Sequence, residues 1–337
     1  MPIRVRSDED GAMPNEVMTV TGPISADQLG FTLVHEHIYL DLMRDTWTGP
    51  CYLADPELAH LELQRYKDAG GVTLVDQTSG GLCENDHDLL FDDDLNHIKH
   101  AVAVRDMAIK TGLNVILGCG WYRETYYEPR LWRMTTDEIA DEMVRDVTEG
   151  IDGTDVRAGF IGEIGAHFNW LSAIEERVLR AAARAQVKTG VALGTHTTRG
   201  PHGLQQLDVL QQEGVDPHRV VVAHAASFPV HKYHYEIAKR GAYVSFDNMG
   251  HLKNANDFDR QRISWLIKQL VDAGFVKNVL FSHDVCYKTQ YATYGGSGYD
   301  FLSTQGPALL SREIGLTTEQ FSTIMVENPR RLLSGEV

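Results

Sequence analysis

Short apolar runs alternate with amphipathic stretches along most of this chain. Eight runs are apolar over most of their length and are bounded by Gly or polar residues, which predicts buried β-strands. These runs are Phe31–His37, Val72–Gln77, Asn114–Trp121, Ala158–Ile164, Val191–Thr197, Val220–Ala225, Ala242–Asp247 and Asn278–His283. Between them a helical period of apolar residues predicts helices over Asp93–Thr111, Thr136–Val147, Ala173–Thr189, Gly203–Glu213 and Asp257–Ala273.

Residues typical of helix ends support this alternation. Ser172 and Asp257 stand at predicted helix starts, and glycines lie at or near four predicted ends, namely Gly112, Gly190, Gly214 and Gly274. Eight strand–helix units predict an α/β fold, specifically a (β/α)8 TIM barrel. The competing doubly wound sheet would need a Gly-x-Gly-x-x-Gly motif after its first strand, and that motif is absent from the sequence.

No Pro/Ser-rich linker divides the chain, so we expect a single barrel domain over residues 16–337, preceded by a flexible N-terminal arm over residues 1–15. The chain has 337 residues, 43% of them hydrophobic, which suits one barrel with a large core. Its net charge of −16 argues against nucleic acid and an anionic membrane as partners. The expected partners are a small-molecule substrate and, in a homodimer, a second copy of the chain.

Location and cysteine chemistry follow from the same sequence. It has no apolar stretch of about 18 residues and no secretory signal at its polar start, so we expect a cytoplasmic protein. Its four cysteines have no Cys-x-x-Cys spacing, which favours free thiols. Cys119 and Cys286 lie near predicted strand ends, where each is either a nucleophile or a small packed residue, the commoner role of buried cysteine.

The first predicted strand ends in His35-Glu36-His37. In a strand, residues i and i+2 point to the same face, so His35 and His37 present two imidazoles side by side and Glu36 faces away. Two neutral imidazoles at this spacing suit a divalent transition metal.

Other residues of the types that bind metals also stand at the ends of predicted strands. The chemistry of such barrels lies at the C-terminal strand ends, and five strands place six candidate ligands there: His35, His37, Glu163, His196, His224 and Asp284. Six ligands are too many for one open catalytic zinc, which usually takes three, and they suit two metals about 3.5–4 Å apart. Zn²⁺ is the expected metal, with Mn²⁺, Co²⁺ or Fe²⁺ as alternatives that the same ligands accept.

The order of these motifs resembles that of the phosphotriesterase family of the amidohydrolase superfamily. The matching stretches are Gly30–His37, Gly194–His196, Ala223–His224, Ser282–Asp284 and the ending Glu327–Leu333. The resemblance implies a binuclear metal hydrolase in which a bridging water attacks the substrate. It also implies that His35, His37 and Asp284 bind a buried metal, that His196 and His224 bind a more exposed one, and that Asp284 accepts the proton.

The chain departs from the family pattern at several positions. Many members bridge the metals with a carboxylated lysine, and here the matching stretch offers Glu163, as in the glutamate-bridged branch of phosphotriesterase-related and phosphotriesterase homology proteins. Ser227 and Asn248 occupy positions where organophosphate-cleaving members have a proton relay of aspartate and histidine. The loop Tyr287–Tyr299 is shorter than that of the acyl-homoserine lactonase members.

These features favour hydrolysis of a lactone or carboxylic ester of a small molecule. The alternatives are an amidohydrolase that acts on an N-acylated small molecule, a weak phosphotriesterase, and more remotely a non-catalytic metal-containing binder. Tyr122 and Asn248 are the expected substrate contacts. Lactonase members have a tyrosine near the position of Tyr122, which either donates to the scissile oxygen or only shapes the pocket.

Several further residues are ambiguous. Asp76 either orients a ligand histidine or caps a helix, and His283 should face away from Asp284 as a structural residue. His231 and His234 have the i, i+3 spacing of a metal pair, but a solvated helix start is the favoured interpretation. His167 and His251 are weaker candidates for substrate contact from loops at the rim.

Overall fold

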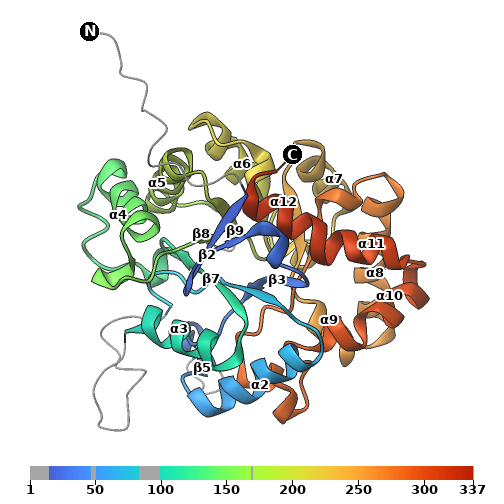
Figure 1. Cartoon of the computed structure of the whole chain (residues 1–337). Helices are drawn as coiled ribbons and strands as arrows, with labels where there is room; N and C mark the ends of the chain where they lie inside the picture. Colours follow the sequence, from blue (N-terminus) through green and yellow to red (C-terminus); the bar gives the residue numbers. More distant parts are fainter. Residues whose placement is uncertain (1–14, 47–50, 83–98, 168–169, 337) are drawn as a thin grey trace.

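The computed structural model describes residues 15–46, 51–82, 99–167 and 170–336 (Figure 1). Eight parallel strands form one sheet in chain order, in which every strand pairs with its neighbours along the sequence. They are β3 (Thr32–Glu36), β6 (Thr73–Asp76), β7 (Asn114–Cys119), β8 (Phe160–Gly165), β9 (Ala192–His196), β10 (Val220–Val222), β11 (Tyr243–Phe246) and β12 (Val279–Phe281).

The two outer strands of this sheet, β3 and β12, approach each other, so the sheet closes into a barrel. The Asp284 N–H, just beyond β12, donates to the His35 carbonyl of β3 at 3.2 Å. Seven of the strands fall within predicted runs, and β8 ends one residue beyond its run, at Gly165. The runs were recognisable because parallel strands covered by helices are buried on both faces and read as continuous apolar segments. The predicted (β/α)8 barrel is confirmed.

Helices surround the barrel (Figure 1). The longer ones are α2 (Pro56–Asp68), α3 (His100–Thr111), α4 (Thr136–Thr148), α5 (Ala173–Thr189), α6 (His202–Gln212), α7 (His231–Lys239), α8 (Asp257–Asp272) and α10 (Gly306–Ile314). The shorter ones are α1 (Met43–Thr46), α9 (Phe301–Thr304), α11 (Thr318–Ser322) and α12 (Asn328–Ser334).

The helix ends agree with the sequence patterns with small corrections. Ser172 caps α5 by accepting from the Glu175 N–H, and Gly190 ends that helix in the left-handed conformation. The cap of α8 is Asn256, which accepts from the Asp259 N–H, so the expected Asp257 is instead the first helical residue. The predicted start of α3 over residues 93–98 lies outside the described residues, as does the predicted arm except for Asn15.

A β-hairpin that the hydrophobic pattern did not indicate closes the N-terminal end of the barrel. It consists of β1 (Glu16–Thr19) and β2 (Gly22–Ser25). Val17 packs with the inward-facing side chains of the strands and with Leu332 and Leu333 of α12, which lies across the same end (Figure 1). Gly159, just before β8, permits this approach, because an added Cβ would lie 2.1 Å from the Met18 carbonyl oxygen.

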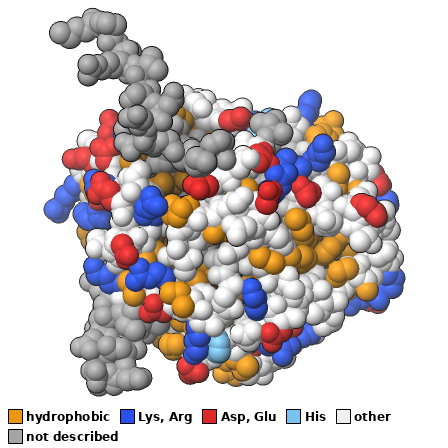
Figure 2. Space-filling model, in the orientation of Figure 1, with side chains coloured by type: hydrophobic (Ala, Val, Ile, Leu, Met, Phe, Trp, Pro, Cys, Tyr) orange, Lys and Arg blue, Asp and Glu red, His pale blue; other side chains and the backbone are white. Residues whose placement is uncertain are grey.

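The polar residues at the C-terminal ends of the strands lie at the opposite end of the barrel. A small antiparallel pair, β4 (Leu40–Asp41) and β5 (Tyr52–Leu53), follows β3. Acidic and basic side chains are interspersed over the face in Figure 2, so the net negative charge is not gathered in one patch there. Among the helices of the described residues, none is both long and apolar enough to span a membrane.

Candidate metal centre

The six predicted ligands meet at the C-terminal ends of the strands. Each comes from a strand or from the residues directly after it, and all but Asp284 are almost completely buried. They are His35 and His37 of the β3 end, Glu163 of β8, His196 of β9, His224 after β10 and Asp284 after β12. The convergence follows from the barrel, because parallel strands direct all their carboxyl ends to one rim.

Glu163 lies at the centre of this cluster. Its Oε2 lies 2.9 Å from His196 Nδ1 and 3.3 Å from both His35 Nε2 and His224 Nε2. Its Oε1 lies 3.8 Å from His37 Nε2. The cluster therefore contains two groups of potential metal ligands, His35–His37–Glu163 and Glu163–His196–His224, which share the one carboxylate.

Asp284 lies near His35 and His37 and also near His224, whose Nδ1 is 3.7 Å from its Oδ2. Its Oδ1 is 3.5 Å from His37 Nε2 and 3.8 Å from His35 Nε2. Its Oδ2 accepts a hydrogen bond from Asn248 Nδ2 at 2.9 Å. Asp284 and His224 both have left-handed backbones, with φ of +53° and +58°. Such strain persists only where the surroundings impose it, and it is common at functional sites.

Neighbouring side chains fix the orientation of two imidazoles. His224 Nδ1 donates to Asp247 Oδ1 at 2.9 Å, and the same carboxylate accepts from the His224 N–H. His37 Nδ1 forms a hydrogen bond with Thr78 Oγ1 at 2.9 Å, in which either atom can donate. The Asp247 carboxylate only accepts, so it places the hydrogen of His224 on Nδ1, and both bonds turn Nε2 of their ring toward Glu163 or Asp284, which is the usual arrangement around ligand histidines. Asp247 and Thr78 were not predicted as site residues.

The donor set fits divalent metal ions. The ring of His35 is buried, yet neither of its nitrogens makes a hydrogen bond within the described residues, although Nε2 faces Glu163. A buried polar atom without a hydrogen bond is costly unless another partner satisfies it. Imidazole nitrogens and carboxylate oxygens together are the ligands that zinc and its neighbours accept.

The charges of the cluster also favour cations. Burial by itself raises the pKa of Glu163, but the facing imidazoles of His196 and His35 overcome it and hold that pKa well below its usual value. Burial lowers the pKa of His35, yet Glu163, Asp247 and Asp284 together raise it to about 9. The carboxylates thus stay ionised and attract positive charge, whether it arrives as protons or as metal ions.

A cavity of about 390 Å³ opens above the cluster. The two predicted substrate contacts line it: Tyr122 follows β7, and Asn248 holds Asp284 from the β11 end. The Tyr122 hydroxyl lies 3.3 Å from His196 Nε2. Apolar side chains form part of the wall, namely Leu40, Leu42 and Leu82. A cavity with a polar floor and partly apolar walls is typical of small-molecule sites.

The structure shows the contacts of the residues whose roles the sequence left open. The oxygens of Asp76 accept from the backbone N–H groups of Ile38 and Thr78, and within the described residues these bonds neither orient a ligand imidazole directly nor cap a helix. His283 is structural, as predicted, with Nδ1 on Glu36 and Nε2 accepting from the Leu302 N–H. His234 is buried against the Ala225 carbonyl, so only His231 fits the predicted solvated helix start.

Three loop residues do not line the cavity. His167 stacks on Trp170 with ring centroids 4.4 Å apart, and His251 is exposed on the loop after β11. The Ser227 hydroxyl accepts from the Arg199 N–H and donates to the Thr197 carbonyl.

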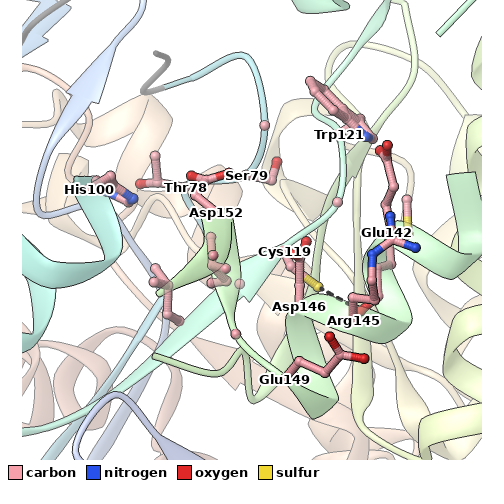
Figure 3. Close-up of a pocket in the computed structure, with 18 of the residues that line it drawn as sticks. Thr78, Ser79, His100, Cys119, Trp121, Glu142, Arg145, Asp146, Glu149 and Asp152 are labelled. Atoms are coloured by element: carbon pink, nitrogen blue, oxygen red, sulfur yellow. Dashed lines mark hydrogen bonds between the residues drawn. The ribbon is translucent and has the colours of Figure 1, made fainter. Parts of the chain in front are cut away.

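A second cavity, of about 370 Å³, lies between the ends of β6 and β7 and helix α4 (Figure 3). Cys119 lines it, and its thiol donates to the Met143 carbonyl. Burial raises the pKa of the Cys119 and Cys286 thiols well above the usual value, so both stay protonated and packing is their supported role. Burial and the nearby Asp152 raise the pKa of Asp146, in the same cavity, to about 7.

Comparisons with known proteins agree with this centre. Residues 15–333 match the model of the phosphotriesterase family. The phosphotriesterase homology protein of Escherichia coli (strain K12) is 31% identical, over 91% of this chain and 98% of its own. The N-acetyltaurine hydrolase of Danio rerio is also 31% identical, over 95% and 98%. The crystal structure of a lactonase from Listeria monocytogenes superposes with a TM-score of 0.83 at 26% identity, over 94% and 98%.

Proposed function

The chain belongs to the phosphotriesterase family and is a metal-dependent hydrolase, and on this premise we propose that it hydrolyses a lactone or carboxylic ester of a small molecule with two divalent metal ions. The observation that carries the proposal is the shared position of Glu163 between two imidazole pairs at the floor of a small-molecule cavity. One carboxylate with two pairs of imidazoles is a ligand set for a bridged pair of metals.

Under this proposal each side of the cluster holds one ion. His35, His37 and Asp284 would hold the first, His196 and His224 the second, and Glu163 both. When bound, such ions polarise a carbonyl oxygen and acidify water. Zn²⁺ is the proposed metal, with Mn²⁺, Co²⁺ and Fe²⁺ as alternatives, because imidazole and carboxylate ligands suit all four.

Asp284 is the proposed proton acceptor. Asn248 holds its Oδ2 at 2.9 Å and so fixes the carboxylate toward the cavity. A carboxylate held in this way takes the proton of the attacking water and then returns it to the leaving oxygen of the ester. General acid–base help of this kind contributes about 10²–10⁴-fold to a rate.

Tyr122 is the proposed donor to the scissile oxygen. With a metal on His196 Nδ1, the Nε2 of this ring would carry the hydrogen and donate to the Tyr122 oxygen, which lies 3.3 Å away. The hydroxyl hydrogen of Tyr122 is then free to point into the cavity that this residue lines. A donor fixed before the reaction stabilises negative charge as it develops on the carbonyl oxygen.

Amide hydrolysis is the second candidate. The relatives named N-acetyltaurine hydrolase match nearly the whole chain, as the Danio rerio protein does. An amine is a poorer leaving group than an alcohol, so amide cleavage needs protonation of the nitrogen in the step that breaks the bond. Asp284 is the acid positioned for that transfer in this cavity.

A substrate comparison with and without metal tests the proposal. Metal-reconstituted protein is assayed with a lactone, an aryl ester, an N-acyl amino acid and a phosphotriester. We expect the lactone or ester to be cleaved fastest, with loss of turnover on chelation and recovery on adding Zn²⁺. Glu163→Gln should retain less metal and lose most of the rate, because it keeps the size and removes the bridging charge. Glu142→Gln, in the second cavity, is the matched control.

Other results of this substrate comparison would contradict or change the proposal. A faster reaction with the N-acyl amino acid would make amide hydrolysis the function. Turnover that persists without metal, or a Glu163→Gln variant with full metal content and full rate, would contradict the shared carboxylate.

A further inference from the structure

The turn that follows β12 is held by one glutamine side chain. Gln290 stands six residues after the candidate ligand Asp284, and its Nε2 donates to the Asp284 carbonyl at 2.8 Å. Its Oε1 accepts from the N–H groups of Cys286 and Tyr287 at 2.8 and 2.7 Å. A primary amide can bind both kinds of backbone group because it carries donor and acceptor atoms together. Gln290 therefore spans the whole turn from Asp284 to Tyr287.

Asp284 is held at both of its peptide groups and at its side chain. Its N–H donates to the His35 carbonyl at 3.2 Å, its carbonyl accepts from Gln290, and its Oδ2 accepts from Asn248 at 2.9 Å. The two peptide groups set the direction in which the side chain leaves the backbone, and Asn248 then fixes the carboxylate. The φ of +53° at Asp284 is unfavourable for a non-Gly residue and persists only under such contacts.

Gln290 is itself fixed by the rest of the loop Tyr287–Tyr299. Its carbonyl accepts from the Gly298 N–H at 2.8 Å, and Gly296 packs so closely that an added Cβ would lie 2.2 Å from the Gln290 carbonyl oxygen. Further along, the buried Glu62 of α2 accepts from the N–H and the hydroxyl of Thr293 at 2.8 and 2.6 Å. The loop is thus a fixed base from which the amide reaches the turn.

We propose that Gln290 is a positioning residue for the hydrolysis, and that its amide keeps the Asp284 carboxylate where it can hold a metal ion and accept the proton. Gln290 does not line the cavity, so it acts through Asp284 and not on the substrate. A displacement of about 1 Å at a reacting group can lower a rate about 10²-fold. The proposal rests on the hydrolase function proposed above for the same site.

The test compares wild-type protein with Gln290→Met, which keeps the length of the side chain and removes all three hydrogen bonds. Where Gln290→Met does not fold, Gln290→Glu, which keeps the two acceptor contacts, takes its place. Gln186→Met is the matched control. Gln186 is also buried and donates to a backbone carbonyl, that of Val191 at 3.1 Å, but it lies between the end of α5 and the start of β9, away from the ligand cluster.

We expect Gln290→Met with saturating Zn²⁺ to lower kcat about 10–100-fold for the substrate that wild-type protein cleaves fastest. KM should change much less, because the groups that line the cavity are unchanged. Zn²⁺ retention against graded chelator concentrations should also fall, because Asp284 is a proposed ligand. Gln186→Met should lower the melting temperature and leave kcat, KM and Zn²⁺ retention as in wild type.

A double variant shows whether Gln290 acts through Asp284. In an Asp284→Asn background, Gln290→Met should cause little further loss of Zn²⁺, because the residue that it positions is already altered. The same loss in both backgrounds, a change in KM alone, or a lower melting temperature with wild-type kcat and Zn²⁺ retention would overturn the proposal. Zn²⁺ retention needs no turnover, so it tests Gln290 even if wild-type protein cleaves none of the substrates, a result that would contradict the hydrolase function instead.

Discussion

At the residue scale, the orientation of the candidate ligands depends on side chains that are not ligands. Asp247 is fully buried, and it accepts both the backbone N–H and the Nδ1 hydrogen of His224. A carboxylate behind a ligand histidine fixes its tautomer and raises its basicity. A signal for Asp247 was present in the sequence, since it is the last residue of the seventh predicted strand, but its contact with the neighbouring strand required the fold.

Asp247→Asn should weaken metal retention by about 10–100-fold, as is usual when such a partner is lost. The asparagine can still accept one hydrogen bond, but its amide nitrogen brings a donor to the His224 side. The measurement is metal content after dialysis against graded chelator concentrations. Asp272→Asn, at the exposed end of α8, is the control. Chelator resistance equal to that of the wild type would mean that Asp247 has no role in holding the centre.

A second residue, Asp146, should make stability depend on pH. Its pKa is raised by burial from the ordinary 3.8 to about 7, so the folded state holds a proton that the unfolded state releases between these values. Stability is therefore lost as the pH rises from 4 toward 7. One pKa unit is worth about 1.4 kcal/mol, which puts the cost at neutral pH and above at no more than about 4 kcal/mol.

Asp146→Asn should consequently raise the melting temperature of the metal-free protein by several degrees at pH 8 and leave it unchanged near pH 4. Asp141→Asn on the same helix is the control. It should lower the melting temperature at pH 8 and not raise it, because the ion pair with Lys188 lowers the pKa of Asp141. A gain for Asp146→Asn of the same size at both pH values would show that ionisation is not the cause.

At the element scale, one glutamate joins the first and last strands of the barrel. The two carboxylate oxygens of Glu36 accept from the Ser282 hydroxyl and from the N–H groups of His283 and Val285, at 2.7–3.0 Å. Glu36 thus holds the segment that leads to Asp284 against the strand that carries His35 and His37. The sequence pattern correctly placed Glu36 on the face opposite to His35 and His37, but it contained no indication of this closing role.

Glu36→Gln should lower stability by roughly 3 kcal/mol, because the amide nitrogen replaces an acceptor that serves buried donors. Thermal or denaturant unfolding measures this loss. Glu57→Gln, at an exposed glutamate on α2, is the control. If the Glu36→Gln variant unfolded like wild type and kept its metal content, the closure of the barrel would depend on other contacts.

The elements that the sequence predicted are buried strands, whereas the elements that it missed are exposed or short. The eight barrel strands are buried on both faces, and their apolar runs marked them clearly. In the hairpin, β2 (Gly22–Ser25) is exposed or half-buried along its length and contains Pro23, so it has no strand signature. The C-terminal helices α9 to α12 include three of seven residues or fewer, which is too short for a helical period to stand out.

At the scale of the whole molecule, the position of the candidate centre is a consequence of the barrel. Six residues up to 249 positions apart come together because parallel strands deliver their carboxyl ends to one rim. The ligand cluster was therefore predictable from strand ends alone. The cavity walls were less predictable, because Arg199 and Leu82 lie on loops whose paths follow from local contacts, such as the hydrogen bond from the Arg199 N–H to the Ser227 hydroxyl.

The central claim is that the cluster around Glu163 binds two metal ions and that both are needed for hydrolysis. The most direct measurement is titration of metal-free protein with Zn²⁺, with the rate of lactone or ester cleavage followed against the number of bound ions per chain. The account predicts that the rate rises until two equivalents are bound and then levels off. Full activity without metal, or a rate that is complete at one equivalent, would contradict it.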